Sequence, residues 1–541
     1  MKHFSILIFF IVIQSNVWAQ TQLIHNSSSN GILDYKPDFN NNIFIKDRPD
    51  QDQRNIAICS AFNGWLYAIY WYPKNSIPYG VLLKSVDNGK TWITLIDDAT
   101  GLTDQVFTRF SIVACGNDTS NLKVFLGMCL YSPNGDVYSG YVSRFNGLTG
   151  ALEAAIFNDT SPMIWDLDLA CDQNYQATGA NPFSIAVVYS KRVGYDSVIV
   201  CTSSNGGISF DNKRNISGSG NHLRNVSISF GRSASYPEGK YFITWEEMQD
   251  ANAKSGHIYT SHSEPNFNSA FTSPVQLDNL YPSAFNNAHH PTISCQVSST
   301  DNAYSNLSEL IVSEKYDAIN NRSDIIGFMN KTAASSTNFQ YTGIDTSTNY
   351  KNQPDIFFNS FDSTFMLTFY DSTNIRLPFL TKNVNLSNPG NWDVISNKYN
   401  TDNNLTAPHP EVILDYAKRS AAFTWIADRS GGSHAAMFDA QFNFPVGIRE
   451  FENQENSFIY SLYPNPARTF VEVDFDLKEK ENIIIKIYNP TGQLKGSLTN
   501  QSFQAGNSKL KLDVSKYLPG IYLFTIQAGN YFGSKKIQIF R

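Results

Sequence analysis

Side chains able to bind an anionic group recur at the entries to short apolar stretches of this chain. Arginine binds carboxylates through paired N–H donors, and protonated histidine also donates to them. Gathered around one axis, such residues could bind an acidic sugar or a peptide carboxylate. They could instead cap loops and form local ion pairs, and both interpretations stay open because the strand register is uncertain by one residue. The candidate ligand-binding residues are Arg54, Arg109, Arg224, His290, Gln353 and His409, with Asp166 and His289 at similar entries.

Catalytic residues stay unassigned. His290 and His409 could ligate a metal, but no carboxylate shares their spacing, so we predict no metal site and no cofactor. The chain has no G-x-S-x-G, no P-loop and no G-x-G-x-x-G after a strand. A pair of carboxylates would be enough for glycoside hydrolysis, but no local motif nominates one.

A unit of about 55 to 66 residues recurs seven times between residues ~40 and 445. Each unit has a short apolar strand, an aromatic-rich second strand and a third strand that ends in a polar turn. In the last three units a proline opens the first strand, at Pro291, Pro354 and Pro410. Regular short strands with about four per repeat predict an all-β fold, a seven-bladed β-propeller over residues 43–446. We expect residues 43–45 to supply the outer strand of the last blade. The predicted second strands are 65–72, 124–131, 183–189, 241–245, 310–312, 365–370 and 421–426.

The six cysteines follow part of the same period. Cys59, Cys115 and Cys171 are separated by 56 residues each, and each closes an apolar stretch. This pattern favours small buried thiols over a disulfide framework, although an exported chain permits disulfides. There is no C-x-x-C and no zinc-like spacing.

Two turns carry a specific pattern. The first reads S-x-D-x-G-x-T-W, and the second, two units later, has Asn for Asp and Phe for Trp. Its Asp or Asn can accept backbone N–H bonds, its Gly permits positive φ, and its aromatic residue fills the core. The pattern resembles the Asp-box (BNR) repeat of sialidase-like propellers, where it has a structural role. The residues are Ser85, Asp87, Gly89, Thr91 and Trp92, then Ser203, Asn205, Gly207 and Phe210.

The resemblance to sialidases does not extend to their catalytic motif. Sialidases carry an arginine in an F/Y-R-I/L-P string before the first blade and have six blades. The only similar string here, at residues 375–378, lacks the aromatic residue and falls in the sixth unit as a third strand. A sialidase activity is therefore disfavoured, while other hydrolases on the same fold stay open.

Export is predicted from the N-terminus. A lysine precedes the apolar run 4–13, and Val17-Trp18-Ala19 is a small-x-small cleavage pattern, so residues 1–19 are predicted to be a signal peptide followed by a segment 20–42. No later segment is apolar enough to span a membrane. The net charge of −7 and the lack of a basic run exclude nucleic acid as an expected partner.

The C-terminal segment, which follows a polar linker at residues 447–458, differs in sequence pattern from the repeats before it. The spacing of alternating strands in residues 459–541 predicts a small Ig-like β-sandwich, and the segment also contains YPNP, an N-P-x-G turn, LPGIY and a terminal lysine pair. This order resembles the type A sorting domain of type IX secretion substrates of Bacteroidetes. The resemblance implies recognition by the outer-membrane translocation machinery, then removal of the tail with release or surface attachment. The alternative is an appended carbohydrate-binding sandwich. The motif residues are Tyr463, Pro464, Asn465, Pro466, Gly492, Pro519, Gly520, Tyr522, Lys535 and Lys536.

These observations predict a secreted or cell-surface propeller that binds a glycan or protein ligand. The alternative is a glycoside hydrolase on the same fold, because fold alone does not decide function.

Overall fold

The computed structural model describes residues 43–540 apart from 100–103, 117–120, 135, 160–162, 173–182, 211, 250–255, 265–269, 281–286, 299–303, 318, 332–337, 346–348, 361–363, 373, 377, 381–391, 395–404, 406–407, 417–419, 430–431, 441–459, 478, 489–493 and 529–530. The predicted signal peptide and the segment after it lie outside these residues. The described chain consists of β-strands and one short 3-10 helix, η1 (Asp278–Leu280), which confirms the all-β prediction. In that part of the chain, no helix is long and apolar enough to cross a membrane.

The described part of residues 43–440 forms seven antiparallel sheets. The first two contain β2 (Arg54–Ser60), β3 (Leu66–Lys74), β4 (Ile77–Ser85) and β5 (Ile93–Ala99), then β6 (Val106–Cys115), β7 (Lys123–Ser132), β8 (Val137–Asn146) and β9 (Leu152–Asp159). The next two contain β10 (Ile164–Cys171), β11 (Ile185–Val193), β12 (Tyr195–Ser203) and β13 (Asn212–Ser219), then β14 (His222–Ser233), β15 (Tyr236–Met248), β16 (Gly256–His262) and β17 (Val275–Gln276).

The last three sheets continue the pattern. They contain β18 (Ala288–Cys295), β19 (Glu309–Asp317), β20 (Arg322–Asn330) and β21 (Phe339–Asp345), then β22 (Lys351–Asn359), β23 (Thr364–Asp371), β24 (Asn374–Arg376), β25 (Pro378–Leu380) and β26 (Trp392–Val394), then β27 (Glu411–Asp415), β28 (Ser420–Asp428) and β29 (His434–Ala440). The outer strand of the last sheet is β1 (Ile43–Phe44), which pairs with β29 through Ile43 and Phe438. The expected closure by the N-terminal strand is thus confirmed.

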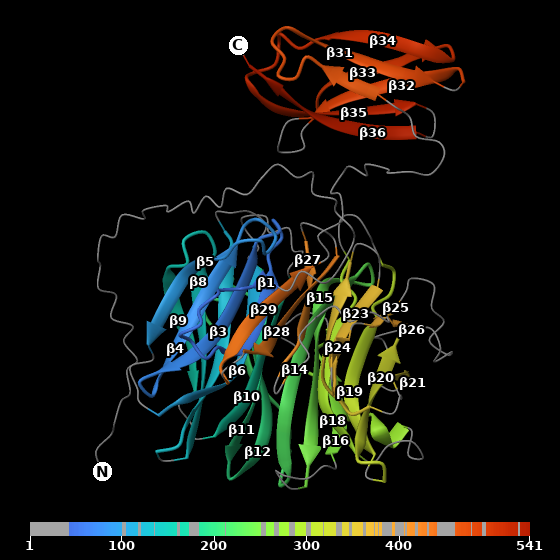
Figure 1. Cartoon of the computed structure of the whole chain (residues 1–541). Helices are drawn as coiled ribbons and strands as arrows, with labels where there is room; N and C mark the ends of the chain where they lie inside the picture. Colours follow the sequence, from blue (N-terminus) through green and yellow to red (C-terminus); the bar gives the residue numbers. More distant parts are fainter. Residues whose placement is uncertain are drawn as a thin grey trace. The chain divides into compact units, whose positions relative to one another are not determined.

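Figure 1 shows four of the first strands, β6, β10, β14 and β18, in the middle of this part of the chain, with outer strands such as β9 and β21 toward its edges. The first strands contact one another in chain order from β2 through β6, β10, β14, β18 and β22 to β27, and β27 contacts β2. A separate apolar cluster lies at each contact between neighbouring sheets. Trp245 and Trp425 are fully buried in two of them. Burial of one such side chain contributes roughly 1.5–3 kcal/mol or more. Packing between sheets therefore stabilises the closed ring.

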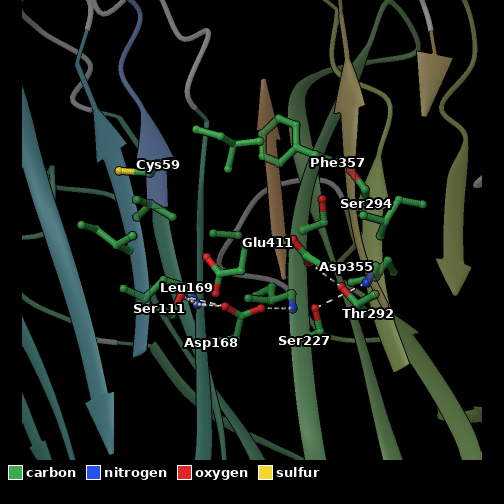
Figure 2. Close-up of a pocket in the computed structure, with 18 of the residues that line it drawn as sticks. Cys59, Ser111, Asp168, Leu169, Ser227, Thr292, Ser294, Asp355, Phe357 and Glu411 are labelled. Carbon is green, nitrogen blue, oxygen red and sulfur yellow. Dashed lines mark hydrogen bonds between the residues drawn. The ribbon is translucent and has the colours of Figure 1, made fainter. Parts of the chain in front are cut away.

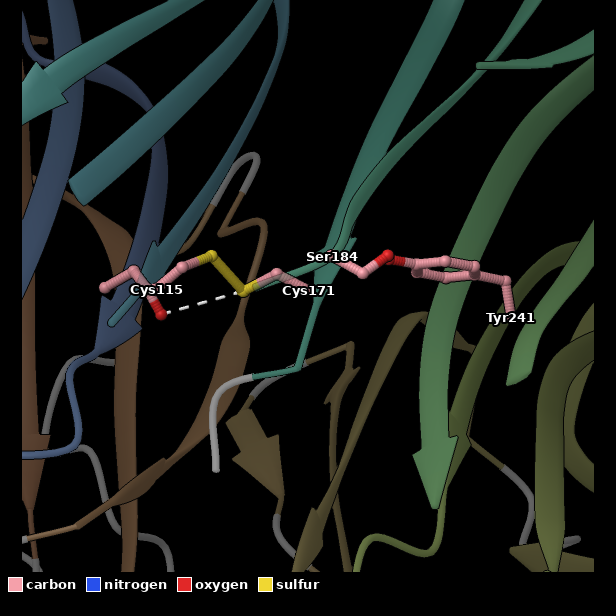
Figure 3. The surroundings of a disulfide bond; sticks show 5 residues. Cys115, Cys171, Ser184 and Tyr241 are labelled. Carbon is pink, nitrogen blue, oxygen red and sulfur yellow. Dashed lines mark hydrogen bonds between the residues drawn. A yellow bond between two sulfur atoms is a disulfide. The ribbon is translucent and has the colours of Figure 1, made fainter. Parts of the chain in front are cut away.

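One disulfide links neighbouring first strands, contrary to the expectation of free thiols. Cys115 of β6 and Cys171 of β10 are bonded, with their Cα atoms 6.6 Å apart (Figure 3). The equal spacing places both residues at the ends of adjacent strands, where they face each other across the sheet interface. The other four cysteines are buried thiols, as predicted. The hydroxyls of Ser184 and Tyr241 form a second link, 2.6 Å apart, between the third and fourth sheets.

The first Asp-box turn has the hydrogen bonds expected from its sequence. The Asp87 carboxylate accepts from the backbone N–H of Thr91 at 2.9 Å and from its hydroxyl at 2.6 Å. Gly89 has a φ of 82°, and its N–H donates to the Ser85 hydroxyl at 2.8 Å. Trp92 is buried and lies edge-on to Phe438 of the last sheet at 5.5 Å. The aromatic residue therefore fills the space between two sheets.

The second Asp-box turn repeats this geometry. Asn205 accepts from the backbone N–H of Ser209 at 3.1 Å, and the Gly207 N–H donates to Ser203 at 3.0 Å. Phe210 packs partly buried against the cluster between the second and third sheets. The amide of Asn205 thus performs the carboxylate's role.

Residues 460–540 form two further antiparallel sheets around one core. One contains β30 (Tyr460–Tyr463), β31 (Phe470–Leu477) and β34 (Gly506–Asp513). The other contains β33 (Leu494–Phe503), β32 (Glu481–Tyr488), β35 (Gly520–Ala528) and β36 (Tyr531–Ile539). Val473 of the first sheet and Ile485 and Phe524 of the second belong to the same buried cluster. The alternation of buried and exposed residues along β31 explains this two-layer packing.

Candidate functional site

Polar side chains connect the first strands around the axis. The Asp168 carboxylate accepts from the N–H of Ile228 at 3.0 Å, and Asp355 accepts from Val412 at 2.8 Å. Ser111 and Ser227 bridge their neighbouring strands in the same way, at 3.1 and 3.4 Å. We call the equivalent positions the inner belt: Ala57, Ser111, Asp168, Ser227, Thr292, Asp355 and Glu411. Figure 2 shows most of them facing the axis.

A second set of side chains lies two residues earlier on each strand. We call it the mouth ring: Asn55, Arg109, Asp166, Asn225, His290, Gln353 and His409. The ladder between first and second strands shifts register at this point in six sheets. The backbone is left-handed at Asn55, Asn225, His290, Gln353 and His409, with φ between 39° and 54°. The mouth ring and the inner belt carboxylates Asp355 and Glu411 line a cavity of about 420 Å³.

The structure brings together five of the six predicted ligand-binding residues. Arg109, Arg224, His290, Gln353 and His409 all line this cavity. Arg54 does not, because the strand register places Asn55 there instead. Its guanidinium donates to Asp52 at 2.6 Å and lies 5.5 Å from the centre of the Trp71 ring. Ligand binding by these residues remains a prediction.

Arg109 of the mouth ring lines the cavity and carries a positive charge. Its Nε lies 3.6 Å from Asp166, whose other oxygen accepts from the N–H of Val226 at 3.1 Å. Burial raises the pKa of Asp166, while the positive charge of Arg109 opposes this rise. The Arg109 side chain is still 43% exposed, so it is open to a ligand in the cavity.

Two histidines of the mouth ring differ in charge. His290 Nδ1 lies 2.9 Å from Glu314, and burial is outweighed by Glu314 and Glu246, which raise the pKa of His290 to about 9. Burial, together with the charges of Arg109 and His290, lowers the pKa of His409 to about 4. His290 is therefore protonated at neutral pH and His409 is neutral.

Hydrogen bonds hold the mouth ring backbone in place. Glu246 accepts from the N–H of His290 at 3.1 Å, and Glu314 accepts from that of Gln353 at 2.8 Å. The Gln353 side chain in turn accepts from the N–H of His409 at 3.0 Å. These bonds hold the backbone of the mouth ring in one conformation and offset the free-energy cost of its left-handed residues.

The carboxylates at the cavity floor were missed by sequence reasoning. Burial, with the nearby charge of Asp168, raises the pKa of Asp355 to about 6. Burial and the charge of Asp355 raise the pKa of Glu411 well above its usual range. Each residue directly follows a proline, Pro354 inside β22 and Pro410 just before β27, and this repeated position was the available signal. A second cavity, of about 180 Å³, lies further along the first strands and is lined by inner belt residues and by the residues that follow them.

Neither a metal site nor a sialidase-like arginine is evident among the described residues. In that part of the chain, no group of three His, Cys, Asp or Glu side chains could hold a metal ion. Arg376 ends β24, which pairs with β23 as the expected third strand, while Leu377 lies outside the described residues.

Comparison with known proteins decides the nature of the C-terminal segment. Residues 461–540 match the model of the secretion system C-terminal sorting domain. This segment is a sorting domain. It directs export to the cell surface or the medium and implies interaction with the type IX machinery, as the sequence predicted. No curated protein matches the chain.

The sorting domain places its motif residues in distinct surroundings. Tyr463 accepts from Lys509 Nζ at 2.9 Å, and Asn465 accepts from the N–H of Gln538 at 2.9 Å. Tyr522 is buried and donates to the carbonyl of Leu518 at 2.9 Å. The peptide bonds before Pro464 and Pro466 are cis. Pro519 and Lys535 are exposed, Gly520 opens β35, Lys536 lies in β36, and Gly492 lies outside the described residues.

Solved structures with a similar chain trace include three glycosidases or related enzymes. An α-L-arabinofuranosidase from Fusarium graminearum has 10% identity and a TM-score of 0.39, with 73% of this chain and 96% of that chain covered. An intramolecular trans-sialidase from Ruminococcus gnavus has 11% identity and a TM-score of 0.37, with 72% and 94% covered. A sialidase from Streptococcus pneumoniae has 12% identity and a TM-score of 0.37, with 74% and 70% covered.

Proposed function

We propose that this protein is an exported, seven-bladed β-propeller that binds a glycan or protein ligand in the cavity of the mouth ring. In this proposal residues 1–19 are the signal peptide, 20–42 a short N-terminal segment, 43–446 the propeller, 447–458 the linker and 459–541 an Ig-like sorting domain. The sorting domain delivers the chain through the type IX machinery and is then removed. The closed order of the seven sheets supports the blade count.

One observation carries the binding function. Charged, amide and aromatic side chains converge on a single cavity of about 420 Å³, large enough for one or two sugar residues. Arg109, Gln353 and Trp165 represent the three kinds. Pre-organised polar groups and a half-buried indole suit a glycan, because a sugar offers hydroxyls at its edges and C–H groups on its faces.

The test is binding of the full chain to a panel of neutral and acidic polysaccharides by affinity electrophoresis. Arg109→Gln should weaken binding of the retained glycan about tenfold, because a charge-assisted hydrogen bond is lost. Arg214→Gln, on the exposed strand β13, is the matched control and should bind like the wild type. Retention of no glycan by the folded wild type would contradict the glycan form of the proposal.

A second candidate function, glycoside hydrolysis, is favoured by Asp355 and Glu411. Both carboxylates line the cavity, and each carries a raised pKa, so one could act as acid while the other is ionised. Chromatography of the same polysaccharides after incubation tests this alternative. If the wild type releases a product that neither Asp355→Asn nor Glu411→Gln releases, hydrolysis is supported. If the wild type leaves the polysaccharide intact, the binding function is the one that stands.

A further inference from the structure

The cations around the cavity are not equally neutralised. Arg109 has Asp166 as its own partner at 3.6 Å, and His290 has Glu314 at 2.9 Å. Arg192 and Arg224, by contrast, share one carboxylate. Asp196, which is fully buried, accepts from Arg192 Nε at 2.5 Å and from Arg224 Nη1 at 2.6 Å.

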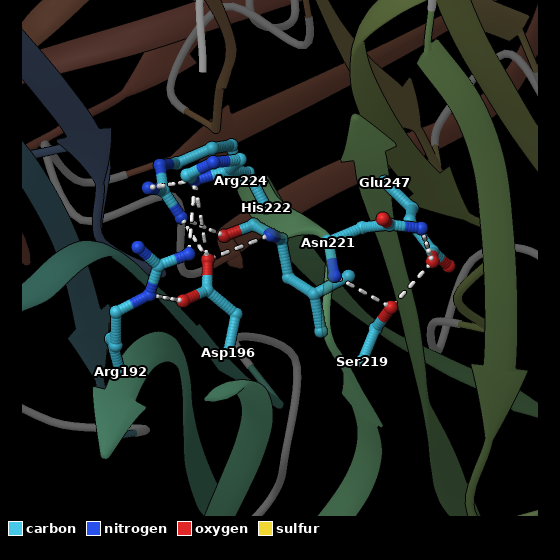
Figure 4. Close-up of polar contacts among 8 residues, drawn as sticks. Arg192, Asp196, Ser219, Asn221, His222, Arg224 and Glu247 are labelled. Carbon is cyan, nitrogen blue, oxygen red and sulfur yellow. Dashed lines mark hydrogen bonds and ion pairs between the residues drawn. The ribbon is translucent and has the colours of Figure 1, made fainter. Parts of the chain in front are cut away.

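His222 adds no negative charge to this cluster. Its Nδ1 lies 3.1 Å from Arg192 Nη2 and 3.2 Å from Arg224 Nη2. The same nitrogen lies 3.9 Å from Asp196 Oδ2, so the imidazole packs among the two guanidinium groups and the carboxylate. Two guanidinium groups and one carboxylate therefore leave one excess positive charge. Figure 4 shows the three basic side chains gathered around Asp196, while Glu247 is bonded to Ser219 and Asn221.

The cluster is rigid and lies beside the cavity. Arg192 pairs with Asp196 across the hairpin of β11 and β12, and its backbone N–H donates to the carbonyl of Met163 at 3.0 Å. Arg224 lines the cavity and lies 3.9 Å from the centre of the Trp165 ring. The Arg192 side chain is 31% exposed, so part of its guanidinium is open to solvent.

A row of half-buried aromatic rings continues from this cluster. Trp165 lies 4.5 Å from Tyr138, which stacks on Tyr131 at 4.4 Å between ring centres. These rings pack beside Trp165 and provide half-buried aromatic surface on which sugar C–H groups can pack. An anion-binding pair beside half-buried aromatic rings and a polar cavity suits an acidic glycan, because its acidic group, C–H faces and hydroxyls each meet a matching kind of side chain.

We propose that Arg192 and Arg224 bind the carboxylate or sulfate group of an acidic glycan whose neighbouring sugar occupies the cavity; this inference rests on the proposed glycan binding. The paired donors match two oxygens of either anion. Arg224 is held in place by Asp196 and Trp165, and Arg192 supplies the more exposed contact.

The experiment compares each acidic polymer with its uncharged form, using the full chain and titration calorimetry. Polygalacturonate and its methyl ester test the carboxylate, while dextran sulfate and dextran test the sulfate. The wild type should bind one acidic polymer at least tenfold more tightly than its uncharged form. Arg192→Gln should abolish that preference. Arg192→Lys should keep part of it, because lysine keeps the positive charge but lacks the paired N–H donors of the guanidinium.

Lys90→Gln removes one positive charge from the exposed first Asp-box turn and should leave the preference unchanged. Thermal melts establish that each variant is folded. Equal binding of acidic and uncharged polymers by the wild type, or an acid preference that survives in Arg192→Gln, would overturn the inference and leave the proposed glycan binding intact. Binding of no polymer, acidic or neutral, would instead overturn both.

Discussion

The Glu411 carboxylate accepts a hydrogen bond from the backbone N–H of Ile58 at 3.0 Å, across 353 residues of sequence. This bond joins the last sheet to the first at the point where the ring closes. Equivalent bonds from Asp168 and Asp355 join sheets that follow each other in the chain. The inner belt thus stabilises the ring while it forms the floor of the cavity.

The closing bond should be measurable through substitutions of Glu411. Glu411→Ala leaves the buried N–H of Ile58 without its acceptor, which should lower the free energy of unfolding by about 1–3 kcal/mol. Glu411→Gln retains a carbonyl acceptor, and the raised pKa of Glu411 already favours an uncharged side chain, so it should be close to wild type at pH 7. Urea denaturation measures both, and equal destabilisation by the two variants would contradict this account.

Glu309 should make the protein less stable as the pH rises. It is buried in β19, accepts from Asn330 at 3.0 Å, and burial raises its pKa to about 8 from the usual 4.5. Between these values the unfolded state ionises first, so the free energy of unfolding falls by up to about 1.4 kcal/mol per pH unit. Glu309→Gln removes this dependence.

The check for Glu309 is urea denaturation of wild type and Glu309→Gln from about pH 5 to pH 8. The free energy of unfolding of Glu309→Gln should exceed that of the wild type by an amount that grows with pH. Exposed Glu238, replaced by Gln, is the control and should show no such trend. A constant difference between wild type and Glu309→Gln would show that Glu309 does not titrate in this range.

His290 should also make the protein less stable as the pH rises, because its charged form stabilises the fold. Its pKa is raised to about 9, so the stabilisation from its charge is complete below about 6.5 and is lost as the pH rises through 9. His290→Asn tolerates the left-handed backbone and should be less stable than wild type at pH 6, with a smaller difference above pH 9. Thermal melts across this range measure the effect.

His409→Asn is the matched control for His290. Because the pKa of His409 is lowered to about 4, it stays neutral in the folded protein between pH 6 and 9. The difference between His409→Asn and wild type should therefore be flat from about pH 7 to 9. A slope like that of His290→Asn would mean that the two rings do not differ in charge.

Gly89 should be sensitive to substitution for two separable reasons. A Cβ at Gly89 would lie 2.0 Å from the Phe438 ring, and the φ of 82° disfavours any other residue. Gly432 has a φ of 85° with no atom within 4 Å of its Cβ position, so Gly432→Ala isolates the backbone cost of about 1 kcal/mol. Gly89→Ala should cost roughly 3 kcal/mol or more in urea denaturation. Equal losses would show that the sheet interface accommodates the methyl group.

The sequence by itself determined the features that depend on local chemistry. Alternating apolar residues and polar turns predicted the strands, and the order of the Asp-box residues predicted the hydrogen bonds of Asp87 and the positive φ of Gly89. The YPNP and LPGIY motifs identified the sorting domain. The strand and Asp-box patterns are readable because the residues that define them lie within a few positions of one another in the sequence.

Only the tertiary structure decided the site. The register shift between β2 and β3 places Asn55, not Arg54, at the cavity, and no local pattern specifies that shift. Burial raises the pKa values of Asp355 and Glu411, and so do carboxylates on strands of other sheets, Asp168 for Asp355 and Asp355 for Glu411. Cys115 and Cys171 are bonded because their sheets are neighbours in the ring. Such relationships depend on which strands pack together, and packing between sheets is set by contacts more than fifty residues apart in sequence.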